Sequence, residues 1–135
     1  MKWLLDTDIC IYIIKQKPIS VLKRFNTVQP GSISLSIITL AELVYGARKS
    51  SAIQKNLNAL HQFIIPFEIV PFGYNAALEY GIIRAELEKL GNPIGPLDTL
   101  IAAHARSLNH TLVTNNEKEF KRIIGLKVEN WTKIE

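Results

Sequence analysis

Hydrophobic residues in this chain fall into two kinds of segment, which predict alternating strands and helices. Short uninterrupted apolar runs are typical of buried strands, and longer segments with apolar residues every three or four positions are typical of amphipathic helices. Strands are predicted at 3–5, 32–35, 67–71, 111–114 and 126–128. Helices are predicted at 9–17, 19–26, 39–47, 51–64, 75–90, 96–108 and 117–123.

This alternation predicts an α/β fold. Strands separated by helices form a central parallel sheet, here of four to five strands, with helices on both faces. The sequence contains no internal repeat, low-complexity segment or linker. We therefore expect one domain spanning residues 1–135.

Polar residues whose side-chain oxygens can act as metal ligands follow several of these elements. Asp6 ends the first strand, and Glu42 lies in the first turn of the helix predicted from Thr39. Asn116 follows the fourth strand, with Glu119 three residues later. Ligands of open α/β sheets bind beyond the carboxyl ends of the strands, where these residues should gather.

Asp98 lies two residues after Pro96, a proline that favours a helix start. The local sequence does not decide which sheet edge it occupies. Each acid also has a local explanation. Asp6 could cap the next helix, Glu42 could complete a capping box with Thr39, and Asp98 could favour the helix dipole.

The acids taken together indicate a metal site. Asp6, Glu42 and Asp98 are each embedded in apolar sequence, and converging carboxylates of low exposure repel one another. A divalent cation offsets that repulsion, and Mg²⁺ prefers oxygen ligands. We therefore predict a magnesium site among these acids.

Composition adds three points. A net charge of +4 and a pI of about 9.3 favour anionic partners such as nucleic acid. The single cysteine, Cys10, excludes an intrachain disulfide and is expected to be a core residue. With no signal peptide and no membrane-length apolar run, a cytoplasmic protein is expected, with no membrane partner.

An ordered set of motifs resembles the PIN-domain ribonucleases, specifically the VapC toxins of type II toxin–antitoxin pairs. No single motif is specific, but the set spans nearly the whole chain in order. The motifs are LLDTDI at 4–9, SLSIITLAEL at 34–43, YGIIRA at 80–85, GNPIGPLD at 91–98, LVTNN at 112–116 with Glu119-Phe120, and ENW at 129–131.

The resemblance assigns the family's metal-binding acids to Asp6, Glu42 and Asp98. It leaves the fourth acidic position open, because Asn116 stands where an acid is usual and Glu119 can supply the charge instead. Asp8 also replaces the usual Asn, either to support the cluster or to cap the helix, and we favour capping. The expected catalytic residues are Asp6, Glu42, Asp98 and Glu119, and the expected metal ligands are Asp6, Asp98, Glu42 and Asn116.

The resemblance implies a Mg²⁺-dependent endoribonuclease, with Mn²⁺ able to substitute, that leaves 5′-phosphate and 3′-hydroxyl ends. Its implied substrate is the anticodon loop of initiator tRNA. Its implied partners are a VapB-like antitoxin, which inserts a basic side chain among the carboxylates, and a second copy in a homodimer. Candidate apolar contact residues for these partners are Ile13, Ile14, Val21, Leu57 and Leu60.

Supporting roles are open for several residues. Thr7 and Thr114 either orient metal ligands or cap local turns. Arg84 either contacts phosphate and neutralises the acids or is an ordinary helix residue. Four basic residues form either a rim that contacts RNA or an ordinary solvated face. They are Lys15, Lys17, Lys23 and Arg24.

Other function classes fit less well. His61, His104 and His110 lack zinc spacing, and a histidine-pair ribonuclease is disfavoured. Asp6-Thr7-Asp8 resembles the nucleophile motif of haloacid-dehalogenase phosphatases, but the expected later lysine and acids are missing. A response-regulator receiver domain is disfavoured similarly, because residues expected of that class are missing as well. A non-catalytic module that binds only antitoxin or operator DNA is disfavoured by the three intact acids.

Overall fold

A five-stranded parallel sheet forms the centre of the molecule. The computed structural model describes residues 1–133, and the strand order is β3-β2-β1-β4-β5. In β1, Trp3 lies beside Ile33 of β2 on one side and Thr111 of β4 on the other. The predicted parallel sheet is therefore confirmed. Its strands are β1 (Trp3–Leu5), β2 (Ile33–Ser36), β3 (Glu68–Val70), β4 (Thr111–Val113) and β5 (Val128–Glu129).

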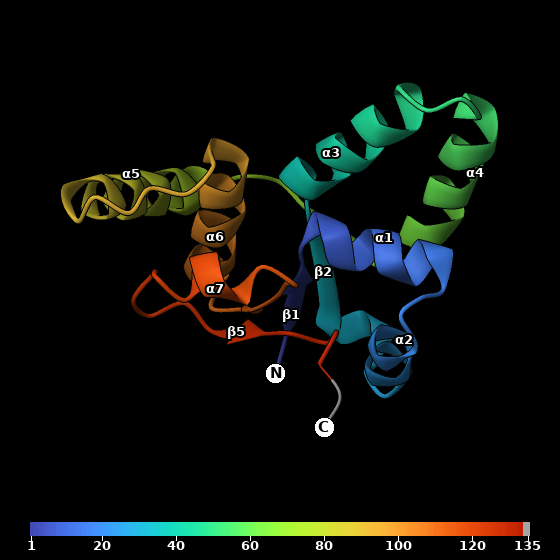
Figure 1. Ribbon diagram of the computed structural model, residues 1–135, viewed down its shortest axis with the longest axis horizontal. Helices are drawn as coiled ribbons and strands as arrows, with labels where there is room; N and C mark the ends of the chain where they lie inside the picture. The colour runs from blue at the N-terminus through green and yellow to red at the C-terminus, as the bar shows by residue number, and fades with distance from the viewer. Residues whose placement is uncertain (134–135) are drawn as a thin grey trace.

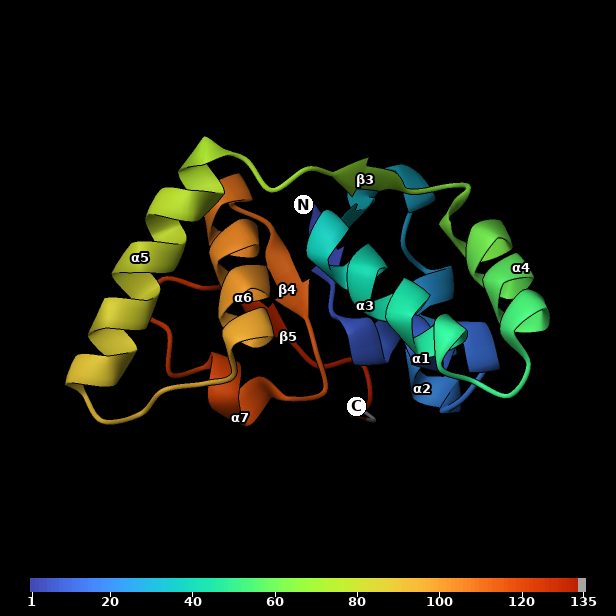
Figure 2. The ribbon, with the colours of Figure 1, turned by 90° about the horizontal axis from the view of Figure 1, so that it is seen from above.

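Helices cover both faces of this sheet (Figures 1 and 2), as the sequence predicts. The first four α-helices lie on one side, and α5 and α6 lie on the other. A short 3-10 turn, Pro30–Ser32, leads into β2. The α-helices are α1 (Thr7–Lys15), α2 (Ile19–Asn26), α3 (Ile37–Arg48), α4 (Ile53–Ile64), α5 (Tyr74–Lys89), α6 (Pro96–Leu108) and α7 (Glu117–Phe120).

Alternation along β1 divides the core into two halves. Leu5 packs with Ile9 and Leu35 in one half, and Leu4 packs with Ile101 and other residues in the other. Successive strand residues point to opposite faces, so β1 contributes to both. Burying each such side chain stabilises the fold by about 1.5–3 kcal/mol. Cys10 is fully buried, as expected.

Most element boundaries differ from the prediction by one or two residues, and three of the differences have a clear physical reason or consequence. Helix α3 begins at Ile37, because the Ser36 hydroxyl already caps it by accepting a hydrogen bond from Ile38 N at 3.0 Å. Glu42 therefore lies in the second turn, and the predicted capping box with Thr39 is wrong. The last helix ends at Phe120. Strand β5 covers Val128–Glu129, because these residues pair with Leu112 and Val113.

The predicted apolar contact surface is wrong for four of its five residues. Ile13, Val21, Leu57 and Leu60 are buried in the protein's own interior, and only Ile14 remains partly accessible. An amphipathic pattern shows that a face is apolar without showing what covers it. Within residues 1–133, no helix has the length and apolar character that crossing a bilayer requires.

Candidate active site

Asp6 stands where β1 ends, at the carboxyl edge of the sheet, and its carboxylate caps α1. Its Oδ1 accepts a hydrogen bond from Thr7 N at 2.7 Å, and its Oδ2 accepts one from Thr114 Oγ1 at 2.8 Å. The residue is only 5% exposed. The strands β1 and β4 lie side by side, which brings Thr114, just after β4, against Asp6. Asp6 is thus held firmly in one position.

Thr7 connects Asp6 to Glu42. Its hydroxyl donates a hydrogen bond of 2.6 Å to Glu42 Oε1, while its backbone N–H binds Asp6. The helices α1 and α3 both start at the carboxyl edge, because each directly follows a strand of the parallel sheet. The prediction that Glu42 lies at this edge beside Asp6 is therefore confirmed.

A second set of hydrogen bonds runs from Thr114 to Glu119. Asn116 N donates to Thr114 Oγ1 at 2.9 Å, and Asn116 Nδ2 donates to Glu119 Oε2 at 2.8 Å. Asn116 and Glu119 therefore lie side by side and do not compete for the same position. One continuous series of hydrogen bonds joins Glu42, Asp6 and Glu119 through the two threonines and Asn116.

Asp98 faces these acids from the first turn of α6. The pKa of its carboxyl is raised to about 6, chiefly by burial and then by the charges of Glu42, Glu119 and Asp8. Burial likewise raises the pKa of Asp6 to about 6, against the hydrogen bonds from Thr114 and Thr7, and the charges of Asp98 and Asp8 add to the rise. Asp98 is therefore on the same edge as the other acids, which the local sequence could not decide.

Asp8 has a different place from the one favoured by the sequence. Asp6 is the N-cap of α1, so the preference for Asp8 as the cap is wrong. Asp8 is exposed in the first turn, and its charge raises the pKa of both Asp6 and Asp98. Of the two alternatives, a contribution to the acid cluster is the one the structure favours.

The residues at this edge suit a hard divalent cation. The donors are all carboxylate, amide and hydroxyl oxygens, which are the ligands of Mg²⁺ and Mn²⁺. Two carboxyls have a pKa raised by burial and by neighbouring acids, and a cation would offset both effects. Within residues 1–133, no three carboxylate, histidine or thiol groups already surround a single point.

Two other residues gain definite positions. Arg84 is exposed and donates to Tyr80 Oη at 2.8 Å and to Glu88 Oε2 at 3.1 Å, so its guanidinium is engaged along α5. This favours the ordinary helix role over neutralisation of the acids. His104 is buried on α6, and its Nδ1 lies 2.7 Å from Ser36 Oγ. Burial lowers its pKa, so the ring is neutral.

Sequence reasoning missed Ser36. This buried serine caps the helix that carries Glu42 and joins that helix to α6 through His104. The available signal was a polar residue at the end of an apolar strand, the same pattern that identified Asp6.

Known proteins resemble this chain closely. It matches the PIN domain family over residues 3–126. It is 46% identical over 132 residues to a tRNA(fMet)-specific endonuclease VapC from Shigella flexneri, an alignment that covers 98% of this chain and 99% of the relative. A protein with the same description from Salmonella typhimurium is 45% identical, with 97% and 98% covered.

The fold comparison agrees with the sequence comparison. A solved structure of VapBC2 from Rickettsia felis, bound to a DNA fragment from its promoter, superposes with a TM-score of 0.91 at 44% identity. The superposition covers 97% of this chain and 99% of that one. By sequence and by fold, the chain belongs to the PIN-domain family and, within it, to the VapC group.

Proposed function

We propose that this chain is the toxin of a VapBC-type pair and acts as a metal-dependent endoribonuclease. The observation that carries the proposal is the series of hydrogen-bonded acids at the carboxyl edge, with Asp98 facing it. The relatives are described as ribonucleases and endonucleases, which supports an enzyme over a non-catalytic module or a phosphatase. The whole chain, 1–135, acts as one PIN domain.

Each acid has a role in the proposed metal site. Asp6, Glu42 and Asp98 hold Mg²⁺, for which Mn²⁺ substitutes. Bound there, the ion would activate water and offset the charge of the phosphodiester. The threonines keep the carboxylates in place, since Thr7 holds both Asp6 and Glu42 while Thr114 holds Asp6.

The fourth position combines two residues. Glu119 supplies the charge, and Asn116 holds the Glu119 carboxylate through its amide N–H. The amide oxygen of Asn116 remains available to the ion or its water. Glu119→Gln should therefore weaken metal binding more than Asn116→Ala does. A nearly normal Glu119→Gln beside an inactive Asn116→Ala would reverse this order.

The proposed substrate is the anticodon loop of initiator tRNA. Two relatives are described as tRNA(fMet)-specific endonucleases. A loop presents an exposed, unpaired backbone that can approach the acid site. The products are 5′-phosphate and 3′-hydroxyl ends. This substrate places the enzyme in the cytoplasm.

Two partner surfaces accompany this function. A groove of about 300 Å³ between α1, α3 and α4 is mostly apolar and extends to Glu42. It suits an antitoxin segment that covers the groove and inserts a basic side chain among the acids. The solved Rickettsia felis and Salmonella typhimurium relatives are VapBC complexes, which supports a VapB-like partner. A homodimer is proposed through α5.

The test is cleavage of purified tRNA by purified protein. EDTA should abolish cleavage, and Mg²⁺ or Mn²⁺ should restore it. Glu42→Gln should reduce the rate at least a hundredfold, whereas Glu86→Gln, an exposed matched change on α5, should not. Mapping the new 5′-phosphate ends identifies the cut. Full activity of a folded Glu42→Gln protein would rule out the site. Widespread cuts in mRNA would show that mRNA, and not initiator tRNA, is the substrate.

A further inference from the structure

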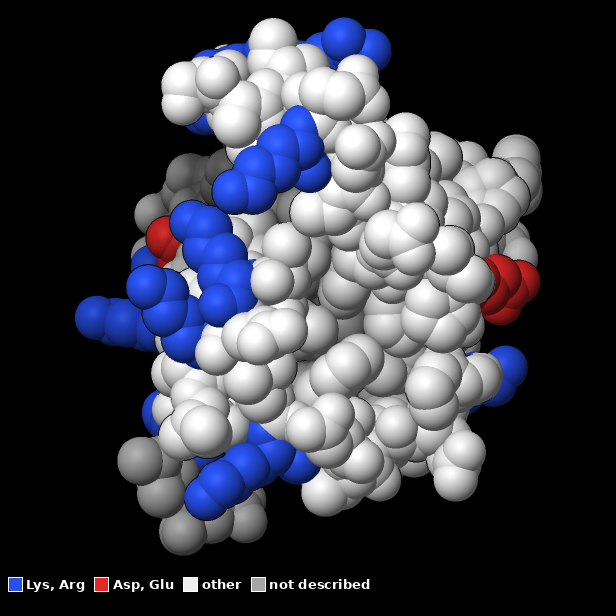
Figure 3. All heavy atoms as spheres, turned by 90° about the vertical axis from the view of Figure 1, so that its right-hand side faces the viewer, with Lys and Arg blue, Asp and Glu red and all other residues white. Residues whose placement is uncertain are grey.

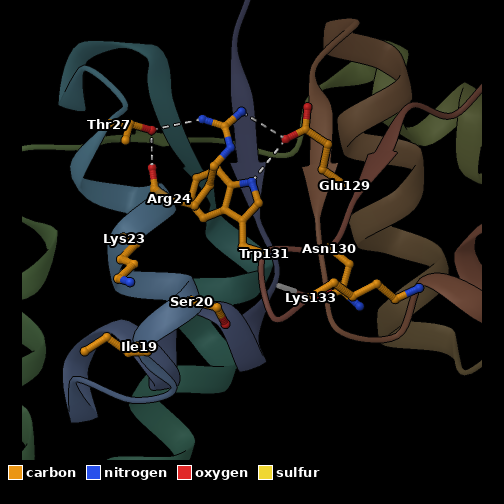
Figure 4. Close-up of a pocket in the computed structure, with 9 residues that line it drawn as sticks. All are labelled: Ile19, Ser20, Lys23, Arg24, Thr27, Glu129, Asn130, Trp131 and Lys133. Atoms are coloured by element: carbon orange, nitrogen blue, oxygen red, sulfur yellow. Dashed lines mark hydrogen bonds and ion pairs between the residues drawn. The ribbon is translucent and has the colours of Figure 1, made fainter. Parts of the chain in front are cut away.

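An open cavity lined by both polar and apolar side chains lies between α2 and the segment that follows β5 (Figure 4). It has a volume of about 690 Å³. No step of the proposed reaction uses it. Its polar lining includes Ser20, Lys23, Arg24, Glu129, Asn130 and Lys133.

The single carboxylate of the lining is already neutralised. Glu129 Oε1 accepts hydrogen bonds from Trp3 Nε1 at 3.3 Å and from Trp131 Nε1 at 3.1 Å, and it pairs with Arg24 at 3.4 Å. The Arg24 guanidinium lies 5.6 and 5.5 Å from the two indole rings. Arg24 is therefore fixed in place, and Glu129 offers little negative charge to a ligand.

The remaining charge of the cavity is positive. Lys23 is exposed, and within residues 1–133 its ammonium makes no ion pair. Lys133 pairs with Glu117, which also pairs with Lys121. Of the three cations in the lining, Arg24 and Lys133 are thus paired with acids, and the positive charge left over within residues 1–133 is that of Lys23. The first turn of α2 carries no acid and its N-cap makes no side-chain hydrogen bond, so the helix dipole adds to the positive potential.

A series of hydrogen bonds connects the segment that lines the cavity to the acid site. Thr132 Oγ1 donates to Asn115 Oδ1 at 3.0 Å, and Asn115 Nδ2 donates to Tyr12 Oη at 3.2 Å. Asn115 directly follows Thr114, whose hydroxyl binds Asp6. Lys and Arg side chains also gather along one edge of the face formed by the first four helices (Figure 3). An extended polymer bound at the acid site would therefore pass close to the cavity.

We propose that this cavity is a subsite for a backbone phosphate of the RNA substrate, at a nucleotide other than the one cleaved. The inference rests on the proposed ribonuclease function. The acid site repels an approaching polyanion, and a neighbouring group of cations compensates for that repulsion. Trp131 is only 3% exposed, so the cavity contacts backbone rather than stacking on a base. The subsite positions RNA without reading its sequence.

The test compares Lys23→Ala with Lys89→Ala, an exposed lysine near the end of α5. With the tRNA substrate, Lys23→Ala should raise KM about fivefold, and the effect on kcat should be smaller. The slope of log affinity against log salt, measured by anisotropy in EDTA, should fall by about 0.7–0.9. For RNA too short to reach the cavity, the KM of Lys23→Ala should be closer to that of the wild type. Lys89→Ala should match the wild type.

Two results would overturn the subsite. One is equal KM and equal salt slope for Lys23→Ala and Lys89→Ala. The other is unchanged RNA affinity in Lys23→Ala together with weaker antitoxin binding, which would assign the cavity to a protein partner. In both cases the wild type still cleaves RNA. Failure of the proposed function is distinct, because the wild type would then show no metal-dependent cleavage.

Discussion

At the scale of single residues, the protonation state of Asp6 and Asp98 controls how tightly the site can bind a metal ion. Asp6 and Asp98 have a pKa of about 6, chiefly because they are buried. A carboxyl must lose its proton before it can bind a cation, so protons compete with metal. Metal affinity should fall about tenfold per pH unit below pH 6 for each of these carboxyls. Calorimetric titration with Mn²⁺ from pH 5 to pH 8 measures this, and a flat profile would contradict it.

The same residues affect stability without metal. A carboxyl whose pKa is raised by folding makes the folded state bind more protons than the unfolded state between about pH 4 and pH 6. Stability from this source is present below that window and is lost as pH rises through it. In EDTA at pH 7, Asp98→Asn should therefore be more stable than wild type by about 1 kcal/mol, a value reduced for solvent screening.

Urea denaturation at pH 7 checks this second expectation, with Glu86→Gln as the uncharged control at an exposed position. The difference between Asp98→Asn and wild type should shrink at pH 4, where the carboxyl is protonated in the folded wild type and partly protonated in the unfolded chain. An Asp98→Asn protein less stable than wild type at pH 7 in EDTA would show that its charge is compensated by other groups.

At the scale of elements, Ser36 joins two helices to the sheet. Its hydroxyl caps α3 and lies against Nδ1 of buried His104 on α6. Ser36→Ala removes the cap and leaves that ring nitrogen without its partner, which should cost about 1–3 kcal/mol. Because α3 carries Glu42, cleavage should slow as well. Thermal melting and cleavage rates test this, with exposed Ser51→Ala as control; an unchanged melting temperature would contradict it.

Most elements were predictable from the sequence because their periodicity is local. The helix at Ile19–Asn26 was placed with the bounds that the structure shows, and most other boundaries shifted by one or two residues. The start of α3 was misplaced because two candidate caps, Ser36 and Thr39, stand close together. Choosing between them depends on where β2 stops, and β2 stops where its pairing with β3 ends.

The site was only partly predictable because its contacts cross the sheet. Asp6, Glu42 and Glu119 could be selected as acids after strands, but the bonds of Thr7 to Glu42 and of Thr114 to Asp6 depend on strand order. That order places β1 between β2 and β4, which no local pattern encodes. The position of Asp98 depends on how α6 packs against α3 and α5. The contacts of Arg24 with the rings of Trp3 and Trp131 likewise join segments far apart in the chain.

At the scale of the whole molecule, α5 presents an apolar face with no covering element within residues 1–133. Tyr74, Leu78 and Ile82 are spaced four residues apart and are 78%, 51% and 49% exposed. Such spacing puts them on one side of the helix, and exposed apolar faces mark interaction sites. We expect Leu78→Asp to convert a dimer into a monomer.

Sedimentation equilibrium tests this expectation, with Ser51→Ala, an exposed change outside α5, as a control. The Leu78→Asp change should leave the fold intact, because the side chain it replaces is half exposed. A wild-type chain that is monomeric at all concentrations, or a Leu78→Asp protein that remains dimeric, would move the interface elsewhere.

The central place of β1 also determines when the toxin can first become harmful during its own synthesis. The strand is made more than a hundred residues before its partner β4. On the ribosome, a nascent chain that has reached Glu42 still lacks Asp98 and the Thr114 hydroxyl that holds Asp6. Interrupted translation therefore releases fragments without a complete set of acids. A cell that makes this protein therefore meets its activity only once β4 and the residues that follow it have been translated.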